Sequence, residues 1–203
     1  MSAPNPHGSF FVSDADSPGR REILRAALTL FVRDGVRETS VRAIAEASGY
    51  SNPALFKHFA SKEELAQFLF QRGYEWMAGG LQSALADDRP FRENLRALVA
   101  RFAALLDEDS EAVLYVQENL RVFWPAVAAT LRRRSIVGLV RRLLEAGVRE
   151  GKVTRDVEVE LLTTIIIGTM GQFARALYFG EHGPNAAHWV PSLEKALERT
   201  VRA

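Results

Sequence analysis

The stretch from Thr39 to Lys62 reads TSVRAIAEASGYSNPALFKHFASK, and its pattern predicts two short helices joined by a tight turn. Ser40 is placed to cap the first helix, because its side-chain oxygen can accept an unpaired backbone N–H. Ile44 and Ala45 follow at helical spacing and indicate one apolar face. Gly49 predicts the end of this helix, since glycine adopts a positive φ without strain.

The second helix of this stretch begins at Ser51 or Asn52, either of which can serve as its cap. Pro53 suits the first helical turn, where a missing N–H costs nothing. We expect Leu55 and Phe59 to point into the core. A helix, a glycine-containing turn and a second short helix form the helix-turn-helix pattern, whose second helix usually lies in the major groove of DNA. The residues left on the outer face are Asn52, Ala54, Lys57 and His58.

At this point the chain resembles the TetR-type transcriptional regulators over about its first third. One departure from the family pattern is Phe56, where the family usually has a tyrosine whose hydroxyl contacts a phosphate. Phenylalanine keeps the packing and removes one hydrogen bond, worth roughly 1 kcal/mol. The residues that carry the resemblance are Phe31, Gly35, Thr39, Ser40, Val41, Arg42, Ile44, Ala45, Gly49, Ser51, Leu55, Phe56, His58, Phe59, Ser61, Lys62 and Leu65.

The resemblance implies a DNA-binding surface made by the two short helices. Lys57 can donate to guanine or to phosphate, and Asn52 can pair with adenine. Arg42 stands where the family often reads a base or contacts phosphate, and Lys62 where it holds phosphate. The alternative is a three-helix unit with no role on DNA. The expected contact set is Thr39, Ser40, Arg42, Ser51, Asn52, Pro53, Ala54, Lys57, His58 and Lys62.

The amino-acid composition and the motifs that are missing exclude several classes of function. The chain has 203 residues, 47% of them hydrophobic, and a net charge of +1, so any DNA-binding charge must be local. The absence of cysteine excludes disulfides and thiolate chemistry. We find no signal peptide, no apolar run of membrane-spanning length, no metal spacing among the four histidines and no catalytic constellation. We therefore expect no enzyme activity, no cofactor, no metal and no membrane partner. The resemblance implies a bacterial cytoplasmic protein associated with the nucleoid.

The remaining chain predicts an all-α fold of nine or ten helices without strands. We expect a disordered arm over residues 1–18, the helix-turn-helix domain over 19–64 and a helical ligand-binding and dimerisation domain over 65–203. Gly79 and Gly80 indicate either a bend in the fourth helix or close approach of a neighbour. The helices expected after the helix-turn-helix cover residues 62–86, 91–107, 111–123, about 125–150, 157–179 and 189–201.

The resemblance also implies a small-molecule pocket in the C-terminal domain, although aromatic residues at helical spacing are also compatible with plain core. Arg132 to Arg134 could bind the phosphate of an acyl-CoA, or could form a solvated face. The aromatic content favours an apolar or aromatic ligand. The expected pocket residues are Trp76, Met77, Phe102, Tyr115, Glu118, Phe123, Trp124, Met170 and Phe173.

A homodimer is implied as well, through the family's last two long helices, which here would be 130–150 and 157–179. The second is very apolar, although a helix central to its own domain would look the same. The expected interface residues are Leu139, Leu143, Leu162, Ile166, Thr169, Met170 and Phe173. Together these expectations describe a repressor that a small ligand releases from a pseudo-palindromic operator. The alternatives are a TetR-type activator and a helical small-molecule-binding protein or enzyme that has lost its DNA function.

Overall fold

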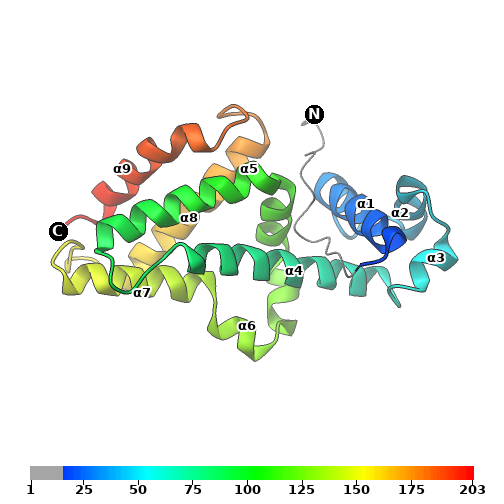
Figure 1. Cartoon of the computed structure of the whole chain (residues 1–203), viewed down its shortest axis with the longest axis horizontal. Helices are drawn as coiled ribbons and strands as arrows, with labels where there is room; N and C mark the ends of the chain where they lie inside the picture. The colour runs from blue at the N-terminus through cyan, green and yellow to red at the C-terminus, as the bar shows by residue number, and fades with distance from the viewer. Residues whose placement is uncertain (1–15) are drawn as a thin grey trace. The chain divides into compact units, whose positions relative to one another are not determined.

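The structure, a computed structural model, describes residues 16–203 (Figure 1). Within this range the all-α prediction is confirmed, and extended pairing is limited to one antiparallel bridge between Val153 and Arg202. None of the helices in this range is both long enough and apolar enough to cross a membrane. The elements are α1 (Pro18–Asp34), α2 (Val41–Ser48), α3 (Asn52–Phe56), α4 (Lys62–Ser83), α5 (Phe91–Phe123), η1 (Trp124–Ala126), α6 (Ala129–Arg133), α7 (Ile136–Arg149), α8 (Val159–Tyr178), η2 (Ala187–Trp189) and α9 (Val190–Val201).

The chain divides into two compact units. The N-terminal unit contains the residues up to Trp76 together with Glu111–Val127, and the C-terminal unit contains Met77–Ser110 and Ala128–Ala203. Helices α4 and α5 therefore each contribute one part to either unit. The sequence suggested a single division near residue 64, and it gave no sign that the second half of α5 packs with the N-terminal helices.

Helix starts in the N-terminal unit are fixed by serine caps. The hydroxyl of Ser40 accepts the N–H of Ala43 at 3.1 Å, and the hydroxyl of Ser61 accepts the N–H of Glu64 at 3.0 Å. The Glu64 carboxylate accepts the N–H of Ala60 at 2.7 Å, so Ser61 and Glu64 form a capping box whose return bond is shifted by one residue. Such caps satisfy backbone donors that a helix leaves unpaired in its first turn.

The core of the N-terminal unit brings α1, α2 and α3 together at the first part of α4 (Figure 1). Gly49 has a φ of 73° and ends α2 in the left-handed conformation, as predicted. The second half of α5 supplies Tyr115, whose ring stacks on Phe31 with 6.0 Å between centroids. The side chains buried here include Ile23, Leu24, Phe31, Ile44, Leu55, Phe59, Leu65, Phe70 and Tyr115.

Helix α5 changes direction at Asp109, where φ is −160° and ψ is 85°. The two helical segments on either side correspond to the two helices predicted over 91–107 and 111–123. The gap between these two predicted helices is therefore a break in α5, next to the boundary between the two units.

The prediction of a single helix over about 125–150 is wrong. The chain forms η1, α6 and α7 there, and α7 starts only after Ser135, whose hydroxyl accepts the N–H of Gly138 at 3.1 Å. A serine inside an apparent helical period can act as a cap instead, because its side chain competes for backbone N–H groups. Arg134 consequently lies outside α6, where it is exposed.

Long-range contacts hold the C-terminal unit. The carboxylate of Glu150 accepts the N–H of Phe91 at 3.0 and 3.1 Å, so α7 caps the start of α5. An added Cβ at Gly147 would lie 2.5 Å from Val153 Cγ2 and 2.7 Å from Phe91 Cδ2. At Gly80 it would lie 3.1 Å from the side chain of Arg101, which identifies this glycine as a site of close approach.

The predicted arm over 1–18 falls mainly on residues outside the described range. Its last part is ordered: Ser17 caps α1, and Asp16 is only 8% exposed. The N-terminal unit therefore includes these residues as part of its packing.

Candidate DNA-binding surface and C-terminal pocket

Helix α3 is held by its cap and by two buried side chains. The hydroxyl of Ser51 accepts the N–H of Ala54 at 3.4 Å. Leu55 is 0% exposed and Phe59 is 2% exposed, as the spacing predicted. These anchors leave the opposite side of the short helix open to solvent.

A group of polar side chains lies on this open side. Asn52 and Lys57 are exposed and His58 is half-buried. Arg42 in the first turn of α2 is exposed too, and so is Ser40, which caps that turn. Exposed amide, ammonium and guanidinium groups can donate to base edges and phosphates. The residues of the expected contact set that stay exposed or half-buried are Ser40, Arg42, Ser51, Asn52, Pro53, Ala54, Lys57, His58 and Lys62.

The side chains of Thr39 and Lys62 also make hydrogen bonds inside the protein. Thr39 is 3% exposed, and its hydroxyl donates to the carbonyl of Gly35 at 2.8 Å. The ammonium of Lys62 donates to the carbonyls of Thr39 at 2.8 Å and Arg37 at 3.1 Å. Both side chains therefore hold the loop before α2. Thr39 is buried, so its hydroxyl is closed to phosphate, whereas the Lys62 ammonium has a third N–H and Lys62 stays a predicted phosphate contact.

An ion cluster fastens the start of α1 to α4. The carboxylate of Asp16 meets Arg72 at 2.6 Å and Arg20 at 3.1 Å. The guanidinium carbons of these two arginines lie 4.9 and 4.7 Å from the ring centroid of Phe68. Arg20 also lies over Phe59, at 4.6 Å, just beyond the end of α3. The cluster thus ties α1, α3 and α4 together and gives α3 a fixed support.

The residues predicted for the ligand pocket fall in both units, and several belong to the core. The Tyr115 hydroxyl donates to the Ala66 carbonyl at 2.8 Å, and burial raises the pKa of this phenol. The assignment of Tyr115 to a pocket wall is therefore wrong, because its polar atom closes a hydrogen bond in the core. In the N-terminal unit, Phe123 packs on Phe70 and Trp124 packs on Tyr74, while Trp76 is half-buried and Glu118 is exposed.

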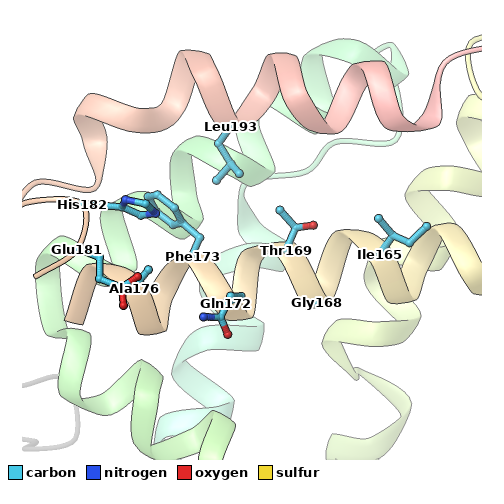
Figure 2. Close-up of a pocket in the computed structure, with 9 residues that line it drawn as sticks. All are labelled: Ile165, Gly168, Thr169, Gln172, Phe173, Ala176, Glu181, His182 and Leu193. Atoms are coloured by element: carbon cyan, nitrogen blue, oxygen red, sulfur yellow. The ribbon is translucent and has the colours of Figure 1, made fainter. Parts of the chain in front are cut away.

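In the C-terminal unit, Met77, Phe102 and Met170 are buried. Phe173 lines an open pocket of about 670 Å³ formed by α8, the loop after it and α9 (Figure 2). The ring of His182 stacks on Phe173 with 5.5 Å between centroids, and Trp189 donates its indole N–H to the His182 carbonyl at 2.9 Å. The lining residues are Ile165, Gly168, Thr169, Gln172, Phe173, Ala176, Glu181, His182 and Leu193.

Sequence reasoning missed most of this pocket, including Gln172, Glu181 and His182. The last two lie in a segment that reads as a plain polar turn, and only the fold brings that turn back beside α8. The sequence shows the repeating apolar positions of α8. Their spacing alone does not predict which side of α8 is covered by the loop with Glu181 and His182.

Most residues of the predicted dimer interface are buried within one subunit. Leu139, Leu143, Leu162 and Ile166 are each at most 5% exposed, because α7 and α8 pack against each other within one subunit. Met170 and Phe173 are also buried, whereas Thr169 is exposed. A different side of α8 stays open, and it carries Leu161, Ile165, Gly168, Thr169 and Gln172.

Among residues 16–203 the structure holds no group of three or more His, Asp or Glu side chains suited to a metal ion. The arrangement that remains is a short helix with exposed hydrogen-bond donors in one unit and an open, mixed-polarity pocket in the other.

Comparison with known proteins agrees with this arrangement. The family described as bacterial regulatory proteins, tetR family, matches residues 23–69, and a tetracyclin repressor-like C-terminal domain matches residues 88–175. The HTH-type transcriptional repressor KstR2 of Rhodococcus jostii is 33% identical over 151 residues, which cover 70% of this chain and 72% of that protein.

Two solved structures share the fold. The ketosteroid transcriptional regulator KstR2 of Mycobacterium tuberculosis has a TM-score of 0.76 at 21% identity, covering 94% of this chain and 97% of the other. FadR of Bacillus subtilis, solved in complex with stearoyl-CoA, has a TM-score of 0.69 at 18% identity, covering 89% and 98%. The capped helix-turn-helix, the helical C-terminal unit and the match to a repressor over most of both chains show that this protein belongs to the TetR family of DNA-binding transcriptional regulators.

Proposed function

We propose that this regulator is a homodimeric repressor of the bacterial cytoplasm that binds a pseudo-palindromic operator and is released from it by an apolar effector. The observation that carries the proposal is the division of α3 between a buried and an open side. Leu55 is fully buried, whereas Asn52, Pro53 and Lys57 are exposed. A short, firmly anchored helix with outward donors suits insertion into a major groove.

On DNA, we assign base contacts to Asn52 and Lys57. A side-chain amide can pair with the N6 and N7 atoms of adenine, and an ammonium can donate to O6 and N7 of guanine. Arg42 and Ser40 stand at the start of α2 and would contact the backbone, which positions the helix without reading sequence. Ala54 and Pro53 offer carbon atoms for a thymine methyl group.

Dimerisation is supported by the open side of α8. Leu161 is 51% exposed and Ile165 is 37% exposed, and Phe179 just beyond the helix is 64% exposed. Large apolar side chains exposed to water are unfavourable, and a second copy would cover them. Two copies related by a two-fold axis would present their α3 helices to half-sites roughly 34–36 Å apart.

For the effector we propose an acyl-CoA or a similar apolar group joined to an anionic carrier. The regulator solved with stearoyl-CoA shares this fold. In this chain Arg132, Arg133 and Arg134 are all exposed around the end of α6, and such a cluster suits phosphate. By linkage, an effector that releases DNA must bind the DNA-free form more tightly than the DNA-bound form.

Selection of bound sequences from a random DNA pool tests the DNA function. We expect enrichment of an inverted repeat whose affinity falls steeply with salt. Lys57→Gln should weaken binding to that repeat at least about tenfold and relax the preference for guanine at one position of each half-site, because both subunits lose a base contact. If the pool shows no enrichment at low salt, the operator proposal is wrong. If the repeat is bound but a reporter gene becomes more active, the protein is an activator.

The effector is tested on the protein–operator complex. We expect stearoyl-CoA to release DNA and to raise the melting temperature of the free protein, whereas free CoA and stearate should do less. Replacing Arg132, Arg133 and Arg134 by glutamine should reduce the response to stearoyl-CoA without changing DNA affinity. An unchanged response in this triple variant would remove the arginines from the effector site.

A further inference from the structure

Tyr50 is an exposed aromatic residue of the helix-turn-helix. It lies in the turn between α2 and α3, immediately before the serine that caps α3. Its backbone N–H donates to the Ala45 carbonyl at 3.0 Å, which fixes the turn. The side chain is nevertheless 39% exposed, so burial does not explain why this turn carries a large ring.

The ring of Tyr50 packs against the backbone of α1 at Gly19, where there is no side chain to keep it away. A Cβ added at Gly19 would lie 3.0 Å from Cε1, 3.1 Å from Cζ and 3.2 Å from the hydroxyl oxygen of Tyr50. These distances are tighter than ordinary contacts between carbon atoms. The polar end of the ring therefore rests on the first turn of α1, and the hydroxyl has a defined position at the edge of the helix-turn-helix.

We propose that the hydroxyl of Tyr50 donates a hydrogen bond to a phosphate of the DNA backbone beside the groove that α3 enters. The inference rests on the proposed operator binding and adds a positioning residue to it. Tyr50 precedes Ser51 and Asn52, which are both exposed and start α3. A side chain at this place flanks the groove wall, where tyrosine hydroxyls are common phosphate donors.

Two features favour phosphate over a purely structural role. A tyrosine has few rotatable bonds, and the seat on Gly19 restricts them further, so little freedom is lost on binding. The exposed aromatic residue on α3 is Phe56, 49% exposed, which has no hydroxyl to offer. Tyr50 thus supplies an aromatic hydroxyl to a surface whose other exposed ring lacks one.

Tyr50→Phe is the direct test, because it removes the hydroxyl and keeps the ring on Gly19. We expect operator affinity to fall roughly tenfold, as for a hydrogen bond to a charged group. The melting temperature and the salt slope should stay the same, since a neutral donor releases no counterion. Tyr115→Phe is the matched control: it removes a hydroxyl from the core and should leave operator affinity unchanged.

Operators with single methylphosphonate substitutions locate the contact. One neutralised phosphate should weaken binding by the wild-type protein and have a much smaller effect on Tyr50→Phe. If every substitution affects both proteins equally, the hydroxyl does not contact a phosphate. Equal operator affinity of Tyr50→Phe and wild type would also overturn the inference while leaving operator binding itself intact. Failure of the wild-type protein to enrich any repeat would instead contradict the proposed function.

Discussion

The two units of this protein begin their helices in different ways. In the N-terminal unit the starts of α1, α2, α3 and α4 are capped by serines three residues away along the chain. In the C-terminal unit the N–H of Phe91 is satisfied by Glu150, 59 residues later. The N–H groups of Ala186 and Ala187 are satisfied by Asp107, 79 and 80 residues earlier. Local caps therefore start these four helices of the DNA-binding unit, whereas the C-terminal unit combines such long-range caps with the local Ser135 cap of α7.

The two kinds of helix cap suit the functions that we propose for the two units. A recognition helix must keep its shape when it meets DNA, and local caps hold it independently of what happens elsewhere. A unit that responds to a ligand benefits from contacts between distant segments, because a shift in one helix then alters the support of another. The following substitutions test the comparison, beginning with the largest expected effect.

Leu55→Ala should be the most damaging change in the N-terminal unit. Leu55 is 0% exposed and forms the main anchor of a five-residue helix. Loss of this side chain should lower the free energy of unfolding by about 3 kcal/mol and abolish operator binding. Thermal unfolding and a DNA titration measure both effects. Retained operator affinity at an unchanged melting temperature would show that the caps alone hold α3.

Gly147→Ala should be the corresponding change in the C-terminal unit. The new Cβ would lie 2.5 Å from Val153 and 2.7 Å from Phe91, so the neighbours must move. We expect a loss of about 2 kcal/mol in stability from overpacking, with operator affinity of the folded protein largely kept. Gly79→Ala is a control on α4 with no atom within 4 Å of the added carbon, and it should not lower stability.

Asp107→Ala removes a long-range cap and should cost about 1.5 kcal/mol, because two N–H donors lose their acceptor. Ser61→Ala removes a local cap and should cost about 1 kcal/mol. Hydrogen exchange distinguishes the two kinds of cap. The Asp107 change should raise exchange around Ala186 and Ala187, whereas the Ser61 change should act on the first turn of α4. Uniform effects over the whole chain would contradict the division into separately held units.

Tyr115→Phe should cost about 1 kcal/mol, the usual net value of one buried hydrogen bond. Burial raises the pKa of Tyr115 above its ordinary value of 10.0. Below pH 10 the phenol of Tyr115 is neutral in both the folded and the unfolded chain, and its full contribution to the free energy of unfolding is present. Above pH 10 the phenol ionises first in the unfolded chain, so this contribution is lost as the pH rises. Stability measured from pH 8 to 11 should therefore fall more steeply for wild type than for Tyr115→Phe.

Glu198→Gln should have the smallest effect. Its carboxylate pairs with Arg92 at 2.7 Å, but the two side chains are 32% and 57% exposed. Exposed ion pairs are screened by water and salt, so we expect a change below about 0.5 kcal/mol. A loss above 1 kcal/mol in chemical denaturation would indicate that this α5–α9 contact is a main support of the C-terminal unit.

The sequence by itself determined the helix-turn-helix, because its signals are local. Ser40, Gly49 and Ser51 specify where α2 and α3 begin or end, and the spacing of Leu55 and Phe59 specifies which side is buried. The same local pattern supplied most of the exposed contact residues. Thr39 was the exception, since a hydroxyl has the same place in the sequence pattern whether it faces DNA or a nearby carbonyl.

Only the tertiary structure decided the C-terminal unit. Apolar period alone could not show that Leu162 and Ile166 face α7 within the subunit while Leu161 and Ile165 stay open. Nor could it show that Ser135 starts a new helix, or that the turn with His182 folds back beside Phe173. Ser135 is a local cap, but its sequence pattern also fits a position inside a helix. The burial of the α8 side chains and the place of the His182 turn depend on which distant segment lies opposite, and no local stretch encodes that.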